Sequence, residues 1–122
     1  MKKRKERLPV TMEAGPANMQ SAAWGEMRSA YMRMGEGVDF TPTLKGLPDD
    51  LCQVPHWCYV LEGEINVRYT DGDEETIEAG QMYYLPPGHT VWFEETTEFV
   101  EFSPRKGMDE VIAHVKKQMQ AA

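Results

Sequence analysis

Alternation between apolar and polar residues dominates the middle of the chain. Residues 65–69, Ile-Asn-Val-Arg-Tyr, have the period of two expected of a half-buried strand. The Asp71-Gly72 pair that follows favours a type I′ hairpin, because glycine tolerates positive φ. Residues 82–85 form another short apolar run, and the prolines at 86 and 87 exclude a helix beyond it. Short strands with turns about every 8 to 12 residues predict an all-β sandwich or barrel.

The two ends of the chain differ from this β region. Residues 1–20 lack a sustained period and contain Pro9, Gly15 and Pro16, which predicts an N-terminal arm. In residues 105–122 the apolar positions recur at helical spacing, with acidic residues early and lysines late. We therefore predict an arm at 1–20, a β-barrel at 21–104 and an amphipathic helix at 105–122. The apolar stripe of the helix should pack against the barrel exterior or a second subunit.

Composition supports one acidic, folded domain. Of 122 residues, 41% are hydrophobic and 27% are charged, as in soluble globular proteins. The net charge is −7, although five of the thirteen lysines and arginines lie in residues 2–7. An acidic body repels phosphate backbones and anionic lipids, so we expect neither nucleic acid nor a membrane as partner. The basic start is not followed by an apolar signal-peptide core, and we expect a cytoplasmic protein.

Four segments between about residues 50 and 103 resemble the two conserved blocks of the cupin superfamily. They are the Tyr-Val-Leu-Glu-Gly-Glu run at 59–64, the Asp71-Gly72 hairpin, the Glu-Ala-Gly turn at 78–80 and the Leu-Pro-Pro-Gly-His run at 85–89. This resemblance implies a double-stranded β-helix, or jelly-roll barrel. It also implies a homodimer and one metal ion held by ligands from both blocks.

The ligand positions depart from the family pattern. Counting back from Gly63 places Asp50, Cys52 and His56 where the family has two histidines and a glutamate. Val91 stands where the second block has its histidine, and His89 lies two residues earlier. No family ligand is therefore carried over by identity.

The chemistry of the first block can still hold a metal. If residues 50–60 form one strand, the even-numbered side chains share a face. That face would carry a carboxylate, two thiols and an imidazole, from Asp50, Cys52, Cys58 and His56. We expect a metal site of Cys52, His56 and His89, with Asp50 as a further candidate and one coordination position open. These donors suit zinc first, with iron or nickel as alternatives.

The role of Cys58 stays open at this point. On one continuous strand Cys52 and Cys58 would lie ~20 Å apart, so a disulfide between them would need a bend. Four glutamates are expected at a solvated edge, namely Glu94, Glu95, Glu98 and Glu101. Trp57 and Tyr59 should lie on the face opposite His56, while four further aromatic residues should form core or cavity wall: Tyr83, Tyr84, Trp92 and Phe93.

These patterns lead to one functional hypothesis and two alternatives. The protein binds a divalent metal in the barrel and acts on, or senses, a small polar molecule. The reaction is not specified, because proteins with this fold have many different activities, and some have no catalytic activity. The alternatives are a metal-free module that binds a small ligand, and a structural dimer whose cavity is filled by aromatic side chains.

Overall fold

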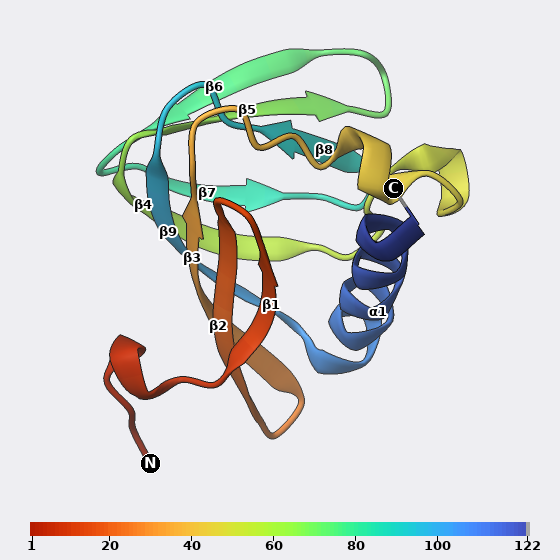
Figure 1. The fold of residues 1–122 in the computed structure, drawn as a ribbon. Coiled ribbons are helices and arrows are strands. Elements are labelled where there is room, and N and C mark those ends of the chain that lie inside the picture. Colours follow the sequence, from red (N-terminus) through yellow and green to blue (C-terminus); the bar gives the residue numbers. More distant parts are fainter. Residues whose placement is uncertain (122) are drawn as a thin grey trace.

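The computed structural model describes residues 1–121, and Ala122, the last residue of the predicted helix, lies outside the described part. Two antiparallel sheets form the body of the molecule (Figure 1). The larger sheet has the strand order β1-β2-β3-β9-β4-β7 and the smaller one the order β6-β5-β8. The strands are β1 (Val10–Ala14), β2 (Ala17–Trp24), β3 (Met27–Met34), β4 (His56–Glu62), β5 (Glu64–Tyr69), β6 (Glu74–Glu78), β7 (Met82–Leu85), β8 (His89–Trp92) and β9 (Thr97–Pro104). The all-β jelly-roll prediction is confirmed as a two-sheet sandwich rather than a closed barrel.

Residues 10–20, which the sequence places in the arm, belong largely to the larger sheet. Strand β1 pairs with β2, and β2 pairs with β3 along its whole length from Ala17↔Met34 to Trp24↔Met27. Before them, a short 3-10 turn, η1 (Lys5–Arg7), is exposed. Two further 3-10 turns, η2 (Thr41–Leu44) and η3 (Pro48–Asp50), lie between β3 and β4.

The hairpin between β5 and β6 is present, but its turn differs from the predicted type I′. Such a turn needs positive φ at both central residues, and here only Gly72 has it, at +90°. The Gly72 N–H donates to the Tyr69 carbonyl at 2.9 Å, and the Tyr69 N–H donates to the Asp73 carbonyl at 2.9 Å. The loop is therefore longer than two residues, and glycine is needed at one position only.

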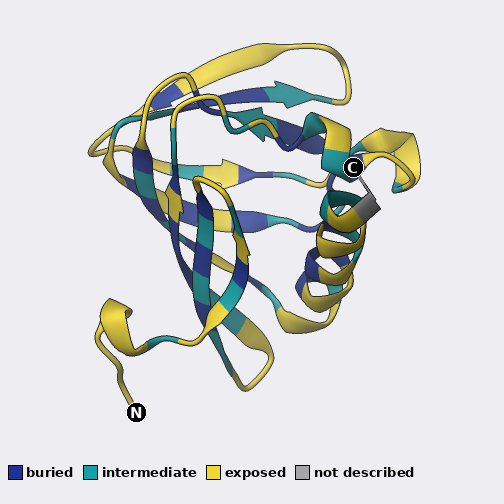
Figure 2. Ribbon diagram, in the orientation of Figure 1, coloured by how far each residue is buried: buried dark blue, intermediate teal, exposed yellow. Residues whose placement is uncertain are grey.

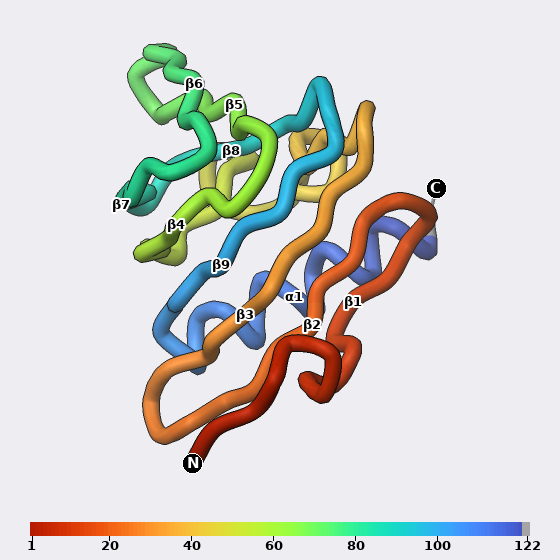
Figure 3. The backbone as a smooth tube through the Cα atoms, turned by 90° about the vertical axis from the view of Figure 1, so that its left-hand side faces the viewer, coloured from red at the N-terminus to blue at the C-terminus, as the bar shows by residue number. Residues whose placement is uncertain are grey.

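The C-terminal helix α1 (Arg105–Ala121) packs on the inner side of the larger sheet. Figure 3 shows it lying along the face of the sheet that carries β1, β2, β3 and β9. Its buried stripe joins the main core through Met108, Val111, Ile112 and Val115 (Figure 2). The stripe thus faces the interior of the sandwich and covers the apolar inner face of the larger sheet. It does not pack against the barrel exterior or a second subunit, contrary to the prediction from the sequence. Within residues 1–121, no helix is long and apolar enough to cross a membrane.

The outer face of the larger sheet carries exposed aromatic residues. Trp57 is 47% exposed and Tyr59 36% exposed, on the face opposite His56 as predicted. Tyr84 is 49% exposed beside Trp57, with the ring centroids 5.4 Å apart, so the prediction that it forms core or cavity wall is wrong. It occupies an even position on β7, whereas the inward residues of that strand are odd-numbered.

Candidate metal site

The segment before β4 is bent and not a continuous strand. Strand β4 begins only at His56, and residues 48–50 form the turn η3, in which Asp49 and Asp50 have φ of +58° and +57°. Cys52 then forms an isolated antiparallel bridge with His89, in which the Cys52 N–H donates to the His89 carbonyl at 2.9 Å. The expectation of one strand from 50 to 60 is therefore wrong in its first half.

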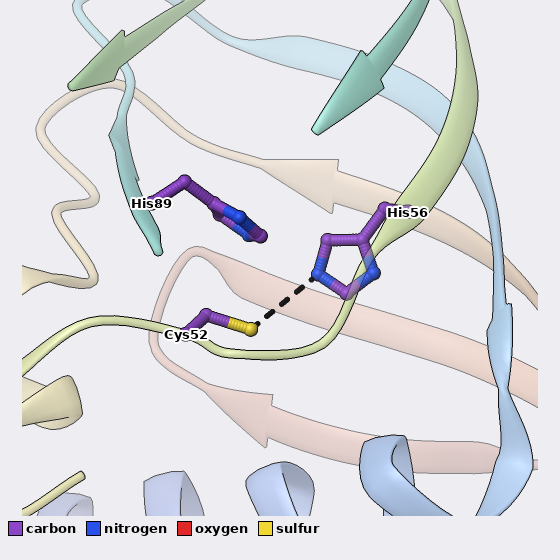
Figure 4. Close-up of side chains that lie close together, drawn as sticks. All are labelled: Cys52, His56 and His89. Atoms are coloured by element: carbon purple, nitrogen blue, oxygen red, sulfur yellow. Dashed lines mark hydrogen bonds between the residues drawn. The ribbon is translucent and has the colours of Figure 1, made fainter. Parts of the chain in front are cut away.

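The bend brings together three side chains of types that can bind a metal (Figure 4). Cys52 Sγ lies 3.6 Å from His56 Nε2, whereas four residues of extended strand would separate the two residues by ~13 Å. His89, at the start of β8, completes the group, and one ligand atom from each of the three lies within 4.8 Å of the others. All three residues are buried.

Hydrogen bonds fix the orientation of both imidazoles. His89 Nδ1 donates to the Pro86 carbonyl at 2.7 Å, and because a carbonyl only accepts, Nε2 of the neutral ring keeps its lone pair. His56 Nδ1 lies 2.6 Å from Ser103 Oγ, which leaves Nε2 directed toward Cys52. The rings of the two histidines meet edge to face at 4.9 Å between centroids.

Burial sets the protonation of the three donors. Burial lowers the pKa of His56 to about 4, and burial together with the neighbouring His56 lowers the pKa of His89 to about 4. Both rings are therefore neutral at neutral pH, which is the form that binds metals. Burial raises the pKa of the Cys52 thiol to about 12, so the thiolate requires a cation beside it. A sulfur and two neutral imidazole nitrogens fit a borderline-soft divalent ion with one coordination position open.

Glu101 belongs to the interior beside this group, contrary to the prediction of a solvated edge. It is 6% exposed, and its Oε1 lies 3.9 Å from His56 Nε2. Burial raises the pKa of its carboxyl to about 7. The signal for this position is present in the sequence, since Glu101 has the same parity as Phe99 on β9 and must therefore share its inward face. Ser103 follows the same parity and was not identified from the sequence either.

Asp50 and Cys58 lie outside the three-residue group. Asp50 is exposed, and its Oδ1 accepts a hydrogen bond from the Gly46 N–H at 3.0 Å, which stabilises the turn before β4. Cys58 is buried two residues beyond His56, and both cysteines are free thiols. Burial also raises the pKa of Cys58, so it behaves as a small apolar residue.

A cavity of about 70 Å³ opens beside the three donors. Its walls come from both sheets, from η2 and from α1, so that the C-terminal helix closes one side of it. Cys52, His56, His89 and Glu101 all contribute to its lining. Val91, at the position of the second-block histidine, also lines it. The arrangement can therefore present a ligand to the open position of a bound metal.

Comparisons with known proteins agree with this architecture. The family model described as "Cupin domain" matches residues 53–101, a range that includes His56, His89 and Glu101 but begins after Cys52. No curated protein matches the sequence.

Several solved structures are similar to the chain. One is a protein of unknown function from Rhizobium leguminosarum, 26% identical, with a TM-score of 0.59 over 85% of this chain and 98% of that one. An RmlC-like cupin from Shewanella frigidimarina is 18% identical, with a TM-score of 0.62 over 85% and 90% of the two chains. A variant of oxalate decarboxylase from Bacillus subtilis is 17% identical, with a TM-score of 0.61 over 82% of this chain and 28% of that one.

Proposed function

The chain contains a small cupin domain, and on that premise we propose that it binds one divalent metal ion and acts on, or senses, a small polar molecule beside it. The ligands would be Cys52, His56 and His89. The observation that carries this proposal is the convergence of one sulfur and two imidazole nitrogens within 4.8 Å, inside the sandwich and next to a cavity.

The surroundings of the donors support a preformed metal site. Pro86 and Ser103 hold the far nitrogens of the two rings, as partners of metal-binding histidines do, and thereby direct Nε2 toward the common centre. When bound, a divalent ion would supply Lewis acidity toward an oxygen or nitrogen of the ligand. Glu101, with Oε1 at 3.9 Å from His56 Nε2, would accept or donate a proton beside the ligand. Zinc is the first choice for this donor set, with iron or nickel as alternatives.

Metal content provides the test. Protein prepared without a polyhistidine tag should contain close to one equivalent of zinc by elemental analysis. Cobalt added to the metal-free protein should give a thiolate-to-cobalt charge-transfer band that Cys52→Ser abolishes, while His56→Ala and His89→Ala should each lose the metal. Cys58→Ser and Asp50→Asn are matched controls that should retain it. Absence of stoichiometric metal, or a band lost in Cys58→Ser and kept in Cys52→Ser, would overturn the proposal.

One observation favours the metal-free ligand-binding module as second candidate. The cavity is lined mainly by apolar side chains and lies between the two sheets and α1, so its shape does not depend on a bound ion. A parent protein without metal, whose unfolding temperature is unchanged by a chelator, would favour this function over the first.

We further propose that the protein is a cytoplasmic homodimer. The two buried free cysteines suit a reducing compartment. The dimer is supported by a continuous apolar patch on the outer face of β9, β4 and β7, because monomeric proteins seldom expose one of such extent. The patch is formed by Trp57, Tyr59, Leu61, Met82, Tyr84 and Phe102, each between 36% and 83% exposed. Strand pairing places them side by side, with Trp57 between Tyr84 and Phe102.

A further inference from the structure

The cavity beside the metal site is almost entirely hydrocarbon and thioether in character. Methionines from three strands and from α1 line it, namely Met12, Met19, Met32 and Met108. Among the described residues no lysine or arginine contributes to its lining, and Glu101 supplies its one carboxyl group. A divalent ion held by the Cys52 thiolate and two neutral imidazoles would have its remaining charge balanced by the nearby Glu101 carboxylate, so a ligand with a full negative charge would bring an uncompensated charge into the cavity.

Polar groups gather at one end of the cavity, in a row across three strands. Strand pairing places Cys58 directly opposite Tyr83 of β7 on one side and Glu101 of β9 on the other. The next row toward the metal site contains His56, two residues away along β4, which corresponds to ~7 Å. Tyr83 and Glu101 both line the cavity. The polar end is therefore adjacent to the metal site and not at the opposite wall.

The buried Tyr83 hydroxyl makes no hydrogen bond of normal geometry, and the Cys58 thiol beside it is a weak partner. An unsatisfied buried hydroxyl is destabilising, and buried polar groups are normally paired with protein, water or ligand. Replacement of this tyrosine by phenylalanine would remove that destabilisation without changing the packing. A tyrosine at this position is explained by a ligand group that bonds to the hydroxyl.

From these observations, and resting on the proposed function, we infer that the molecule bound beside the metal site is small, uncharged and mainly hydrocarbon, with one hydroxyl-type head group held between Tyr83 and Glu101. The head group supplies the polarity that the proposed function requires, and the methionine-lined wall takes the hydrocarbon part. The cavity of about 70 Å³ is roughly half the size of the ~150 Å³ engineered cavity that binds benzene. The ligand therefore has a handful of non-hydrogen atoms.

Three simple probes separate this ligand class from the others. 1-Propanol has the proposed character, ethylene glycol has the same number of non-hydrogen atoms but two hydroxyls, and propionate is an anion of similar size. Binding is followed by NMR of the ¹³C-labelled methionine methyl groups, four of which line the cavity. Met1 and Met82 are exposed at 117% and 83% and serve as internal controls whose signals should not saturate. Each titration is performed with zinc-loaded and with chelator-treated protein.

We expect 1-propanol to shift the cavity methyl signals saturably in both forms. In the chelator-treated form, where no metal can take an oxygen ligand, ethylene glycol and propionate should bind at least about tenfold more weakly, because each places an unpaired polar or charged group against hydrocarbon. Tyr83→Phe should weaken 1-propanol binding about fivefold, the effect of losing one hydrogen bond, whereas Tyr84→Phe, on the outer face, should not change it. Glu101→Gln keeps the shape of the head-group site and should still bind 1-propanol, and because it removes the carboxylate it should reduce the disadvantage of propionate.

The inference is overturned if ethylene glycol or propionate binds the chelator-treated protein as tightly as 1-propanol, or if Tyr83→Phe binds 1-propanol like the parent. It is also overturned if 1-propanol fails to saturate the cavity signals. Elemental analysis is independent of these titrations. If elemental analysis finds no metal while the selectivity for 1-propanol is observed, the metal site is refuted and the inferred ligand class is retained.

Discussion

Cys52 and His56 are only four residues apart, and their side chains nevertheless meet, with Sγ 3.6 Å from Nε2. The contact exists because the chain bends between them instead of continuing as a strand. Backbone hydrogen bonds from the segment before β8 hold the start of the bend in place. The Gly88 and His89 N–H groups donate to the Cys52 carbonyl at 2.7 and 3.2 Å. The second block of the sequence therefore positions Cys52, the proposed ligand from the first block.

The Gly88 turn should be essential to this arrangement. Gly88 has φ of +89°, and a Cβ there would overlap Thr70 Oγ1. Gly88→Ala should therefore lower the free energy of unfolding by about 2 kcal/mol or more and weaken zinc binding. Gly72→Ala is the matched control, since φ is +90° but no atom lies within 4 Å of the added Cβ. Urea unfolding of both variants tests this, and equal destabilisation would contradict it.

Removing the hydroxyl that holds His56 should weaken the metal site. Ser103→Ala deletes the partner 2.6 Å from His56 Nδ1. Loss of such a partner typically reduces metal affinity by about 10- to 100-fold, and we expect the lower end of that range here. Competition with a chromogenic chelator measures the affinity. Ser29→Ala on the neighbouring strand β3, which pairs with Phe102, should leave zinc affinity unchanged.

Acidification should destabilise the metal-free protein. The pKa of His56 and of His89 lies near 4 because both rings are buried, while histidines in the unfolded chain titrate near 6.5. Between these values the unfolded chain binds more protons than the folded one, so the free energy of unfolding falls as the pH falls from about 6.5 to 4. In the presence of a chelator, the urea midpoint should be lower at pH 5 than at pH 7.

Glu101 provides an internal control for this pH effect. Burial raises the pKa of the Glu101 carboxyl from 4.5 to about 7. Between pH 7 and 4.5 this carboxyl is therefore protonated more in the folded chain than in the unfolded one, and its contribution to the free energy of unfolding increases as the pH falls. The Glu101 contribution therefore offsets one histidine. Glu101→Gln should steepen the loss of stability toward pH 5. If stability depends less steeply on pH in this variant than in the parent, the raised pKa of Glu101 is contradicted.

An ion pair should anchor the helix that closes the cavity. Arg28 on β3 donates through Nε to Asp109 Oδ1 at 2.8 Å, and its Nη1 donates to Ser21 Oγ at 3.0 Å. The Arg28 side chain is only 14% exposed. Asp109→Asn should therefore cost about 1 kcal/mol and accelerate hydrogen exchange in α1. The exposed neighbour Glu110 is the control, and Glu110→Gln should have no measurable effect.

The apolar patch of the outer sheet should carry the dimer. Light scattering should give twice the 13.9 kDa mass of the chain for the parent protein. Trp57→Arg, at the centre of the patch, should yield a monomer, because an arginine there would be desolvated without a partner. Trp24→Arg changes a tryptophan of similar exposure, 42%, at the far hairpin and should remain dimeric. A parent of 13.9 kDa would refute the dimer.

Local signals predicted the central strands and the positions of the turns, and failed where the chain bends. The alternation of residues 65–69 and the glycine turns are local properties, because each depends on neighbouring side chains and on φ. The bend before His56 depends on the bridge to His89, more than thirty positions away. Strand alternation places Glu101 on the same face as the buried Phe99. The neighbouring glutamates nevertheless favoured the prediction of an exposed edge, because glutamate is rarely buried.

The sequence by itself determined the fold class, the amphipathic C-terminal helix and the supply of sulfur and imidazole donors in two separate blocks. Tertiary structure decided which of these donors meet, since it excluded Asp50, separated Cys58 from the group and brought His89 to Cys52. It also decided that the helix faces inward and that Glu101 is buried. The physical reason is that alternation and propensity act over a few residues, whereas burial and convergence depend on strands that pair across the whole chain.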